Sequence, residues 1–277
     1  MTETATRRRR HIGFLQIAAI SLIAVMVLVV VVLPFLAARD PLQQDAANRF
    51  ASIGTPGYPL GTDGFGRDVF SRIVHGLRTE LIICVLSALF AGILGTILGL
   101  LGGYFGRFVE IITMRVVDII LGFPHIILAL LIVTLYGPGS VTLIFAMSVI
   151  FTPGFARLTY GQVLSVKSMP YVEAANVFGS TRRHTLFKVI LPNSMAPSIV
   201  QFSLTIPAAI LLESGLSFLG LGVVPPTPSL GLMIAEGQRY MSSHPEALLV
   251  PSIVVVLVIL AFGVLGEALR DWFDPRR

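Results

Sequence analysis

The 277 residues are strongly apolar: 55% are hydrophobic, only 13% are charged, and the mean hydropathy is +0.85. These values exclude an ordinary water-soluble domain and indicate a polytopic membrane protein whose spans are helical. The net charge of +5 is explained by topology and by attraction to anionic lipid, because no basic face with interleaved aromatic residues suggests a nucleic-acid surface.

A helix crosses the hydrocarbon core of about 30 Å with roughly 20 apolar residues, so uncharged runs of that length mark candidate spans. The first run, Ile12–Ala38, follows the basic cluster Arg7–Arg10. A cleaved secretory or twin-arginine signal is the alternative, but the run is longer than a signal's apolar region and no clear A-x-A site follows it. Residues 1–40 are therefore predicted to be a basic tail and a first span that is retained.

Residues 41–80 form the longest predicted outer loop. Prolines and glycines break any regular pattern before the motif Gly61-Thr62-Asp63-Gly64-Phe65-Gly66-Arg67-Asp68. Its glycines suggest a phosphate-binding loop, but no Gly-Lys-Ser/Thr ends the motif and no strand pattern precedes it. We expect a folded loop in which Asp63 and Asp68 pair with Arg67, Arg72 or nearby backbone amides.

Residues 81–277 are predicted to form a core of five further spans. One charge-free stretch, Ile119–Ala156, is divided in two because Gly137-Pro138-Gly139 favours a tight turn. The five spans are predicted near Leu81–Gly106, Arg115–Tyr136, Val141–Tyr160, Pro197–Leu221 and Leu248–Gly266. The expected fold class is an all-α integral membrane protein with six transmembrane helices.

Between the fourth and fifth of these six spans, residues 161–195 form a polar loop on the predicted inner face. Pro170 can start a short helix over Tyr171–Phe178, with Glu173 in its first turn and Gly179 as its C-terminal cap. Ser180 or Thr181 can cap a second helix, which is predicted to end before Pro192. From the residues alone, an ordinary capped surface helix and a partner-binding element both stay open.

Ionisable residues inside a span are costly and by default suggest function. Asp118 lies three residues after Arg115, so an ion pair between them is a sufficient structural account. Glu213 has no basic residue within one helical turn, and its role stays open between a buried polar contact and a residue of the transport path. His125 follows Pro124 and is expected to bond a carbonyl that a proline kink frees. Cys84 is the one cysteine, which excludes an intrachain disulfide.

The distribution of Lys and Arg predicts the orientation. With the N-terminus inside, 14 of the 20 basic residues lie on inner segments, although five of the six outer ones share one loop. Both termini are therefore predicted to be cytoplasmic. The inner residues are Arg7–Arg10, Arg107, Arg115, Arg157, Lys167, Arg182, Arg183, Lys188, Arg270, Arg276 and Arg277; the outer ones are Arg39, Arg49, Arg67, Arg72, Arg78 and Arg239.

Several motifs, in order along residues 58–275, carry a family resemblance. They are Leu60–Arg72, Gly103–Gly106, Glu173-Ala174-Ala175 with Gly179, Leu191-Pro192-Asn193, Leu216–Gly222, Pro225–Pro228 and Leu269–Pro275. Together they resemble the permease subunits of ABC importers, and within them the C-type permease of the dipeptide and oligopeptide branch. Val189, Glu267 and Phe273 depart from the family pattern but roughly keep volume or charge.

This resemblance implies a type I importer fold and a coupling role for the inner loop, which is often called the EAA loop. Its coupling residues would be Glu173, Ala174, Ala175, Gly179, Leu191 and Pro192. The implied partners are a homologous B-type permease, two ATP-binding subunits or domains and an extracytoplasmic substrate-binding protein. ATP and Mg²⁺ would bind to the ATPases, and this chain would hold no catalytic, cofactor or metal site. The implied location is a bacterial cytoplasmic membrane.

Two other functional classes predict features that the sequence lacks. A secondary transporter or channel predicts paired broken helices and several buried charges at mid-membrane, and it leaves the inner loop unexplained. A membrane enzyme predicts titratable residues clustered at one depth. The cargo itself is open, because the same branch includes importers of nickel, haem and glutathione beside those of peptides.

Overall fold

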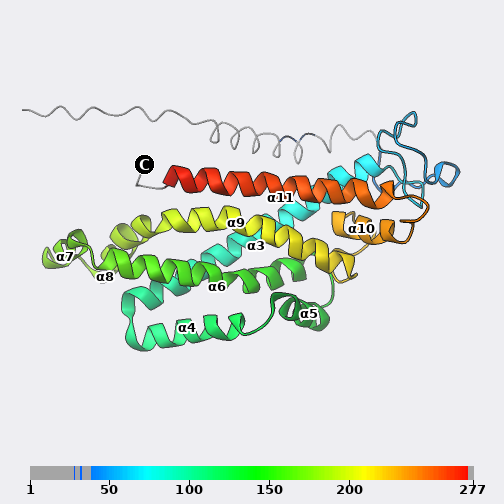
Figure 1. Ribbon diagram of the computed structural model, residues 1–277. Coiled ribbons are helices and arrows are strands. Elements are labelled where there is room, and N and C mark those ends of the chain that lie inside the picture. Colours follow the sequence, from blue (N-terminus) through cyan, green and yellow to red (C-terminus); the bar gives the residue numbers. More distant parts are fainter. Residues whose placement is uncertain (1–27, 29–31, 33–38, 274–277) are drawn as a thin grey trace, which may run out of the picture.

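The computed structural model describes residues 28, 32 and 39–273, which form an all-helical bundle (Figure 1). The predicted first span lies outside these residues apart from positions 28 and 32, as does the arginine-rich tail. The described helices are η1 Ala46–Asn48, α3 Val69–Phe105, α4 Arg107–Leu121, α5 His125–Tyr136, α6 Ser140–Lys167, α7 Pro170–Val177, α8 Arg182–His184, η2 Thr185–Ile190, α9 Leu191–Phe218, α10 Leu230–Gln238 and α11 Glu246–Phe273.

Four helical segments in the described part are long and apolar enough to cross a membrane. They are α3, α6, the continuous segment Arg182–Phe218 and α11, so four of the predicted spans are found as helices. The predicted third span is wrong as a single helix, because α4 and α5 meet at an angle of 92°. Pro124 has no N–H and disfavours helical geometry at the residue before it, which ends α4 at Leu121.

His125 is consequently the first residue of α5 and does not lie inside a kinked span. Its ring lies edge-on to Phe151 of α6, with ring centroids 6.3 Å apart. The residues of the turn, Gly122, Phe123 and Pro124, are all exposed.

The outer loop is shorter than predicted, because α3 begins at Val69 and not near Leu81. The Asp68 side chain caps this helix by accepting a hydrogen bond from the Ser71 amide at 3.0 Å. The prediction placed the boundary at 80 because it counted only uncharged residues. Arg72 and Glu80 lie inside the helix and are buried against other elements.

Small residues let α3 pack closely against α6. Ala91, Gly95, Gly99 and Gly103 recur every four residues and are all buried on one face of α3. A Cβ added to Gly95 would lie 2.6 Å from the Thr152 carbonyl oxygen of α6, and one added to Gly99 would overlap the Ala156 carbonyl. Stripes of this kind bring membrane helices into backbone contact.

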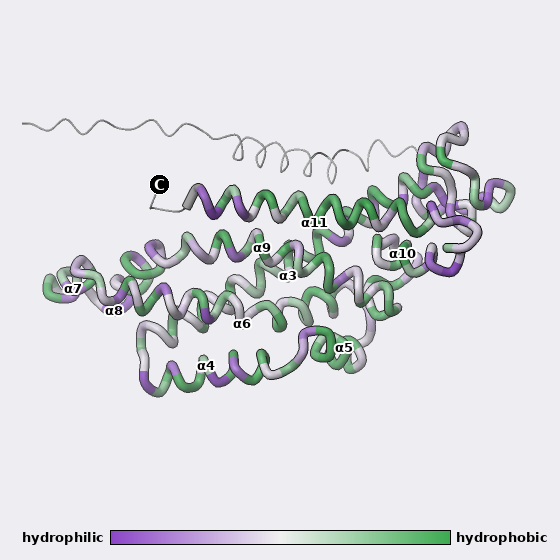
Figure 2. Tube along the Cα trace, in the orientation of Figure 1, coloured by the Kyte–Doolittle hydropathy of each residue, from purple (hydrophilic) through white to green (hydrophobic). Residues whose placement is uncertain are grey.

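The segments predicted to be inner and outer gather at opposite ends of the bundle, which we name the inner and outer ends after that prediction (Figure 1). One end holds α7, α8 and the start of α4, and the other holds η1, α10 and the loop before α3. Figure 2 shows hydrophilic residues concentrated towards these ends and a hydrophobic stretch along α11 between them. A small apolar cluster fixes the inner end, made of Leu100, Val163, Val166, Val172, Leu186 and Ile190.

The glycine stripe predicts that an added methyl group destabilises the protein on the face of α3 that contacts α6 and has little effect elsewhere on the helix. Gly99→Ala should lower the free energy of unfolding by about 1–3 kcal/mol, because the α6 backbone cannot make room for the Cβ. Gly92→Ala is the matched control, since its Cβ would meet Phe155 at an ordinary 3.5 Å. Thermal unfolding in detergent measures both. Equal stability of the two variants would contradict close α3–α6 packing.

Candidate functional site

The inner end of the bundle presents the short helix α7. Pro170 begins it, and Glu173 lies exposed in its first turn, where its negative charge complements the helix dipole. Val172 is the buried residue of α7 and belongs to the inner apolar cluster. Ala174 is exposed and Ala175 is half-buried. One face of α7 therefore packs against the bundle, and the opposite face is exposed to solvent.

Gly179 ends α7 as the sequence predicts. Its φ of +81° lies in the left-handed region, which favours glycine. The Ser180 amide donates to the Ala175 carbonyl at 3.0 Å and the Gly179 amide to Asn176 at 3.1 Å, the pair of bonds that defines a Schellman cap. Thr181 then caps the next helix by accepting from the His184 amide at 3.3 Å.

The second helix of this segment does not end before Pro192, which corrects the prediction. The chain is helical without interruption from Arg182 through α8, η2 and α9 to Phe218. Leu191 and Pro192 are the first two residues of α9, but Pro192 lies well inside the continuous helix, so its missing N–H removes one backbone hydrogen bond at the junction with η2. The preceding η2 has π-helical geometry, in which the Leu191 amide donates to Leu186.

Large apolar side chains project from the tip of α7. Phe178 is 89% exposed and Val177 is 79% exposed, and Tyr171 is also exposed on this helix. Exposed apolar side chains of this kind are typical of surfaces that contact another protein or a membrane. Together with Glu173 and Ala174, these side chains form what we call the α7 surface.

The outer end is held by a network of four charged residues. Arg67 donates to Asp63 at 2.7 Å and to Glu236 of α10 at 2.9 Å. Arg72, which is 1% exposed, donates to the same two carboxylates at 3.0 and 3.1 Å. The predicted pairing of Asp63 with Arg67 and Arg72 is confirmed, whereas Glu236 was missed because it lies more than 160 residues away.

The glycines of the outer motif serve the backbone of this loop. Gly61 and Gly66 have φ of +75° and +76°, and a Cβ on either would overlap a carbonyl oxygen of the preceding segment. Thr62 accepts from the Ala51 amide at 2.8 Å and donates to the Asn48 carbonyl. With Asp68 as the cap of α3, the whole motif folds the loop onto the outer end of the bundle.

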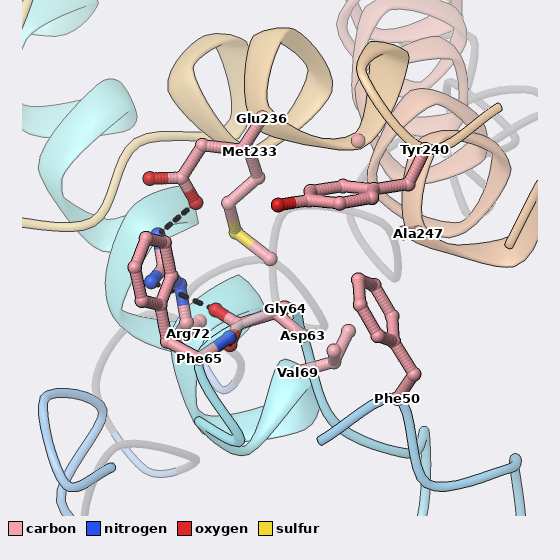
Figure 3. A pocket seen from close by; sticks show the side chains of 11 residues that line it. Phe50, Asp63, Gly64, Phe65, Val69, Arg72, Met233, Glu236, Tyr240 and Ala247 are labelled. Carbon is pink, nitrogen blue, oxygen red and sulfur yellow. Dashed lines mark hydrogen bonds and ion pairs between the residues drawn. The ribbon is translucent and has the colours of Figure 1, made fainter. Parts of the chain in front are cut away.

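A cavity of about 30 Å³ lies beside this network. Figure 3 shows Asp63, Arg72 and Glu236 along one side of it and the rings of Phe50 and Tyr240 along the other. Its volume suits one or two water molecules and no larger ligand. Burial raises the pKa of Glu236 above its ordinary value, and the charge of Arg67 opposes this rise. On acidification, Glu236 therefore takes up its proton at a higher pH than an ordinary glutamate.

Glu213, whose role the sequence leaves open, is completely buried in α9. Its Oε1 accepts from Ser217 at 2.6 Å and from Ser229 at 3.3 Å. The next residue of α9, Ser214, donates to Glu80 of α3 at 2.6 Å, so Glu213 lies beside a second carboxyl group that is equally buried. The predicted boundary at residue 80 assigned Glu80 to the outer loop, so sequence reasoning missed this partner.

Asp118 forms a different ion pair from the one predicted. Its Oδ1 accepts from Arg157 of α6 at 2.8 Å, with both side chains about half exposed, and the predicted pairing with Arg115 is not formed. The two helices α4 and α6 pack side by side here, which brings Arg157 closer than a residue on the same helix. Asp118 thus has a structural partner at the surface of the bundle.

Comparison with known protein families identifies the family of this chain. Residues 91–277 match the model of the binding-protein-dependent transport system inner membrane component. The chain belongs to this family. Both α7 and Glu213 lie within the matched residues, whereas the outer motif and Glu80 precede them. The protein is therefore a multi-pass membrane component of a binding-protein-dependent transport system.

Individual relatives cover most of this permease. The dipeptide transport system permease protein DppC of Haemophilus influenzae is 36% identical over 96% of this chain and 90% of its own length. The glutathione transport system permease protein GsiD of Pectobacterium atrosepticum is 40% identical over 78% of this chain and 72% of its own.

Among solved structures, the MetNI methionine ABC transporter in inward-facing conformations matches the permease with a TM-score of 0.58 at 19% identity. The match covers 73% of this chain and 96% of that one. The fold is that of a type I ABC importer transmembrane domain, as predicted.

The outer ion-pair network predicts a cost when one carboxylate of the permease is neutralised. Glu236→Gln leaves the buried Arg72 with a single carboxylate partner and should lower the free energy of unfolding by about 2–3 kcal/mol. Glu246→Gln is the control, because its contact with His244 lies at the surface and should be worth under about 1 kcal/mol. Thermal unfolding of the two variants compares them, and equal midpoints would show that the network adds no stability.

Proposed function

We propose that this chain forms half of the path by which an ATP-driven importer carries di- or oligopeptides across the cytoplasmic membrane. The observation that carries the proposal is the α7 surface, which is exposed and apolar at one end of a membrane-spanning bundle. An apolar helix face at this place fits a groove of a soluble partner. The partner that an importer needs there is the subunit that hydrolyses ATP.

The connection of α7 to α9 supports this role. A single turn at Gly179 separates α7 from the continuous helix that runs from Arg182 to Phe218. The buried Val172 also fastens α7 to Leu186 and Ile190 of that helix. A partner that displaces α7 would therefore move the inner end of a spanning helix as a packed unit, which is how two-state transitions amplify a small shift. Glu173, Ala174, Ala175 and Gly179 contribute to the coupling surface, and Leu191 and Pro192 begin the helix that responds.

The proposed importer contains further subunits beside this permease. Two ATP-binding subunits or domains would bind ATP and Mg²⁺ and carry out hydrolysis, so this chain itself acts without a cofactor. A homologous B-type permease would supply the other half of the path. A substrate-binding protein would deliver cargo to the end that holds η1 and α10. The α7 end and both chain termini face the cytoplasm in this arrangement, in keeping with the excess of Lys and Arg on these segments.

Peptides are the cargo that the relatives favour. Several dipeptide permeases are 36–37% identical over nearly the whole chain. The glutathione permease of Pectobacterium atrosepticum supports glutathione, itself a tripeptide, as the second candidate. Both cargoes share a peptide backbone with free charged groups.

The coupling role predicts that the α7 surface is needed for ATPase binding and not for folding. Replacing Val177 and Phe178 with alanine should reduce copurification of the ATPase subunits and transport about tenfold or more, because it removes the two most exposed apolar side chains of the α7 surface, whose burial against a partner would stabilise the complex. The thermal unfolding midpoint of the permease should not change. Glu173→Lys and Gly179→Val should weaken coupling in the same assays.

The matched control for this variant lies at the opposite end of the bundle. Tyr136 and Val141 are 70% and 81% exposed, so their replacement with alanine removes similar exposed apolar area. ATPase copurification should survive in that control. Normal ATPase binding and uptake by the Val177 and Phe178 variant would remove the coupling proposal.

The proposed cargo predicts the order of competition in an uptake assay. In proteoliposomes that contain the complete importer and its binding protein, uptake of a labelled dipeptide should be blocked by unlabelled di- and tripeptides and not by free amino acids. Stronger competition by glutathione than by dipeptides would move the assignment to the second candidate. Loss of ATP dependence would contradict the importer itself.

A further inference from the structure

Two completely buried carboxyl groups meet inside the bundle, one from each of two spanning helices. Glu80 lies in α3 and Glu213 in α9, and both are 0% exposed. Glu80 of α3 accepts a hydrogen bond from Ser214, the residue that follows Glu213 in α9, which brings the two carboxyl groups together between these helices. Glu80 is eleven residues into α3 and Glu213 is five residues from the end of α9, which places the pair in the outer part of the bundle.

Serine hydroxyls satisfy one oxygen of each carboxyl group. Ser214 donates to Glu80 Oε1 at 2.6 Å, and Ser217 donates to Glu213 Oε1 at 2.6 Å. The remaining oxygens, Oε2 of Glu80 and Oε2 of Glu213, are buried and have no hydrogen-bond donor in the described part of the chain. Two carboxylates can only accept, so their contact cannot satisfy either oxygen while both are ionised.

No basic side chain in the described residues compensates the pair. Along α3, the buried thiol of Cys84 lies one turn after Glu80, and the basic Arg78 is exposed. Elsewhere on the surrounding elements, His75 of α3 bonds the Ser71 carbonyl and Glu236 of α10 is held by Arg67 and Arg72. In α6, Arg157 pairs with Asp118, and α11 has no charged residue between Glu246 and Glu267.

One bound proton resolves this arrangement. It turns one carboxyl group into a donor, which can then bond an acceptor oxygen of the other. It also removes the repulsion between two like charges in a medium that screens charge poorly. Because the donor and acceptor come from α3 and α9, the shared proton ties the two helices together.

We propose that Glu80 and Glu213 form a proton-binding site that joins α3 to α9. The site holds at least one proton at neutral pH, taken from solvent, and loses it only when the two helices separate or the solution becomes strongly alkaline. This inference concerns the pair itself and is independent of the cargo and of the ATPase contact proposed above.

Infrared spectroscopy of the full-length permease, reconstituted with its copurifying subunits, tests the site directly. The wild type at pH 7 should show the carbonyl stretch of a protonated carboxylic acid, with a shift in D₂O. Glu80→Gln and Glu213→Gln should each lose this band, because a glutamine donates to the remaining carboxylate and removes the need for the proton. Glu246→Gln should keep the band, since that carboxyl group lies at the surface.

Thermal unfolding gives a second, independent readout. The wild-type midpoint should fall as the pH rises through the range in which the band disappears, because two buried like charges then face each other. Either glutamine variant should fold and should lose this pH-dependent fall. A wild type without the band, or a band that survives both substitutions, would overturn the proposal. A midpoint that rises with Na⁺ and not with protons would overturn it in favour of a metal cation.

Discussion

The close contact of α3 with α6 is the interaction on which the other arrangements depend. Glycines at every fourth position allow the two backbones to touch, and this fixes the inner half of α3 against α6. From that position, α3 offers Arg72 to the outer carboxylates and Glu80 to α9. At its inner end, the Tyr104 carbonyl accepts from Lys167, the last residue of α6, at 2.7 Å. A displaced α3 would lose all three contacts at once.

Because the interior is apolar, each buried polar side chain needs a hydrogen-bond or ion-pair partner within the protein. Buried hydroxyls of Ser87, Thr152 and Thr205 donate to carbonyls one turn earlier in their own helices, at 2.7 to 2.8 Å. A buried charged side chain is not neutralised by a carbonyl of its own helix, so its partners come from other elements. The outer network and the Glu80–Glu213 pair are the two outcomes: in one, arginines neutralise the carboxylates, and in the other, hydroxyl groups and a shared proton take their place.

Hydropathy and capping signals predicted most of the helices, because both act between residues that are close in the sequence. Pro170, Gly179 and Thr181 therefore gave α7 and its turn correctly. The boundary at residue 80 was wrong for the opposite reason: Arg72 and Glu80 can be buried in α3 because Glu236 and Ser214 approach them from distant segments. Asp118 shows the same limit, since its partner Arg157 lies on a neighbouring helix. Contacts between helices are absent from any local pattern.

The turn between α4 and α5 has a consequence for the surroundings of this chain. Fifteen residues of α4 rise about 22 Å from the inner end, which is less than the roughly 30 Å of a hydrocarbon layer. The twelve residues of α5 then leave at 92°, so the non-helical backbone from Gly122 to Pro124 falls at membrane depth. The Gly122 and Phe123 amides bond carbonyls of α4, whereas the first amides of α5 have no acceptor within that helix, and fatty acyl chains offer them none. A neighbouring polypeptide or water therefore has to line this elbow.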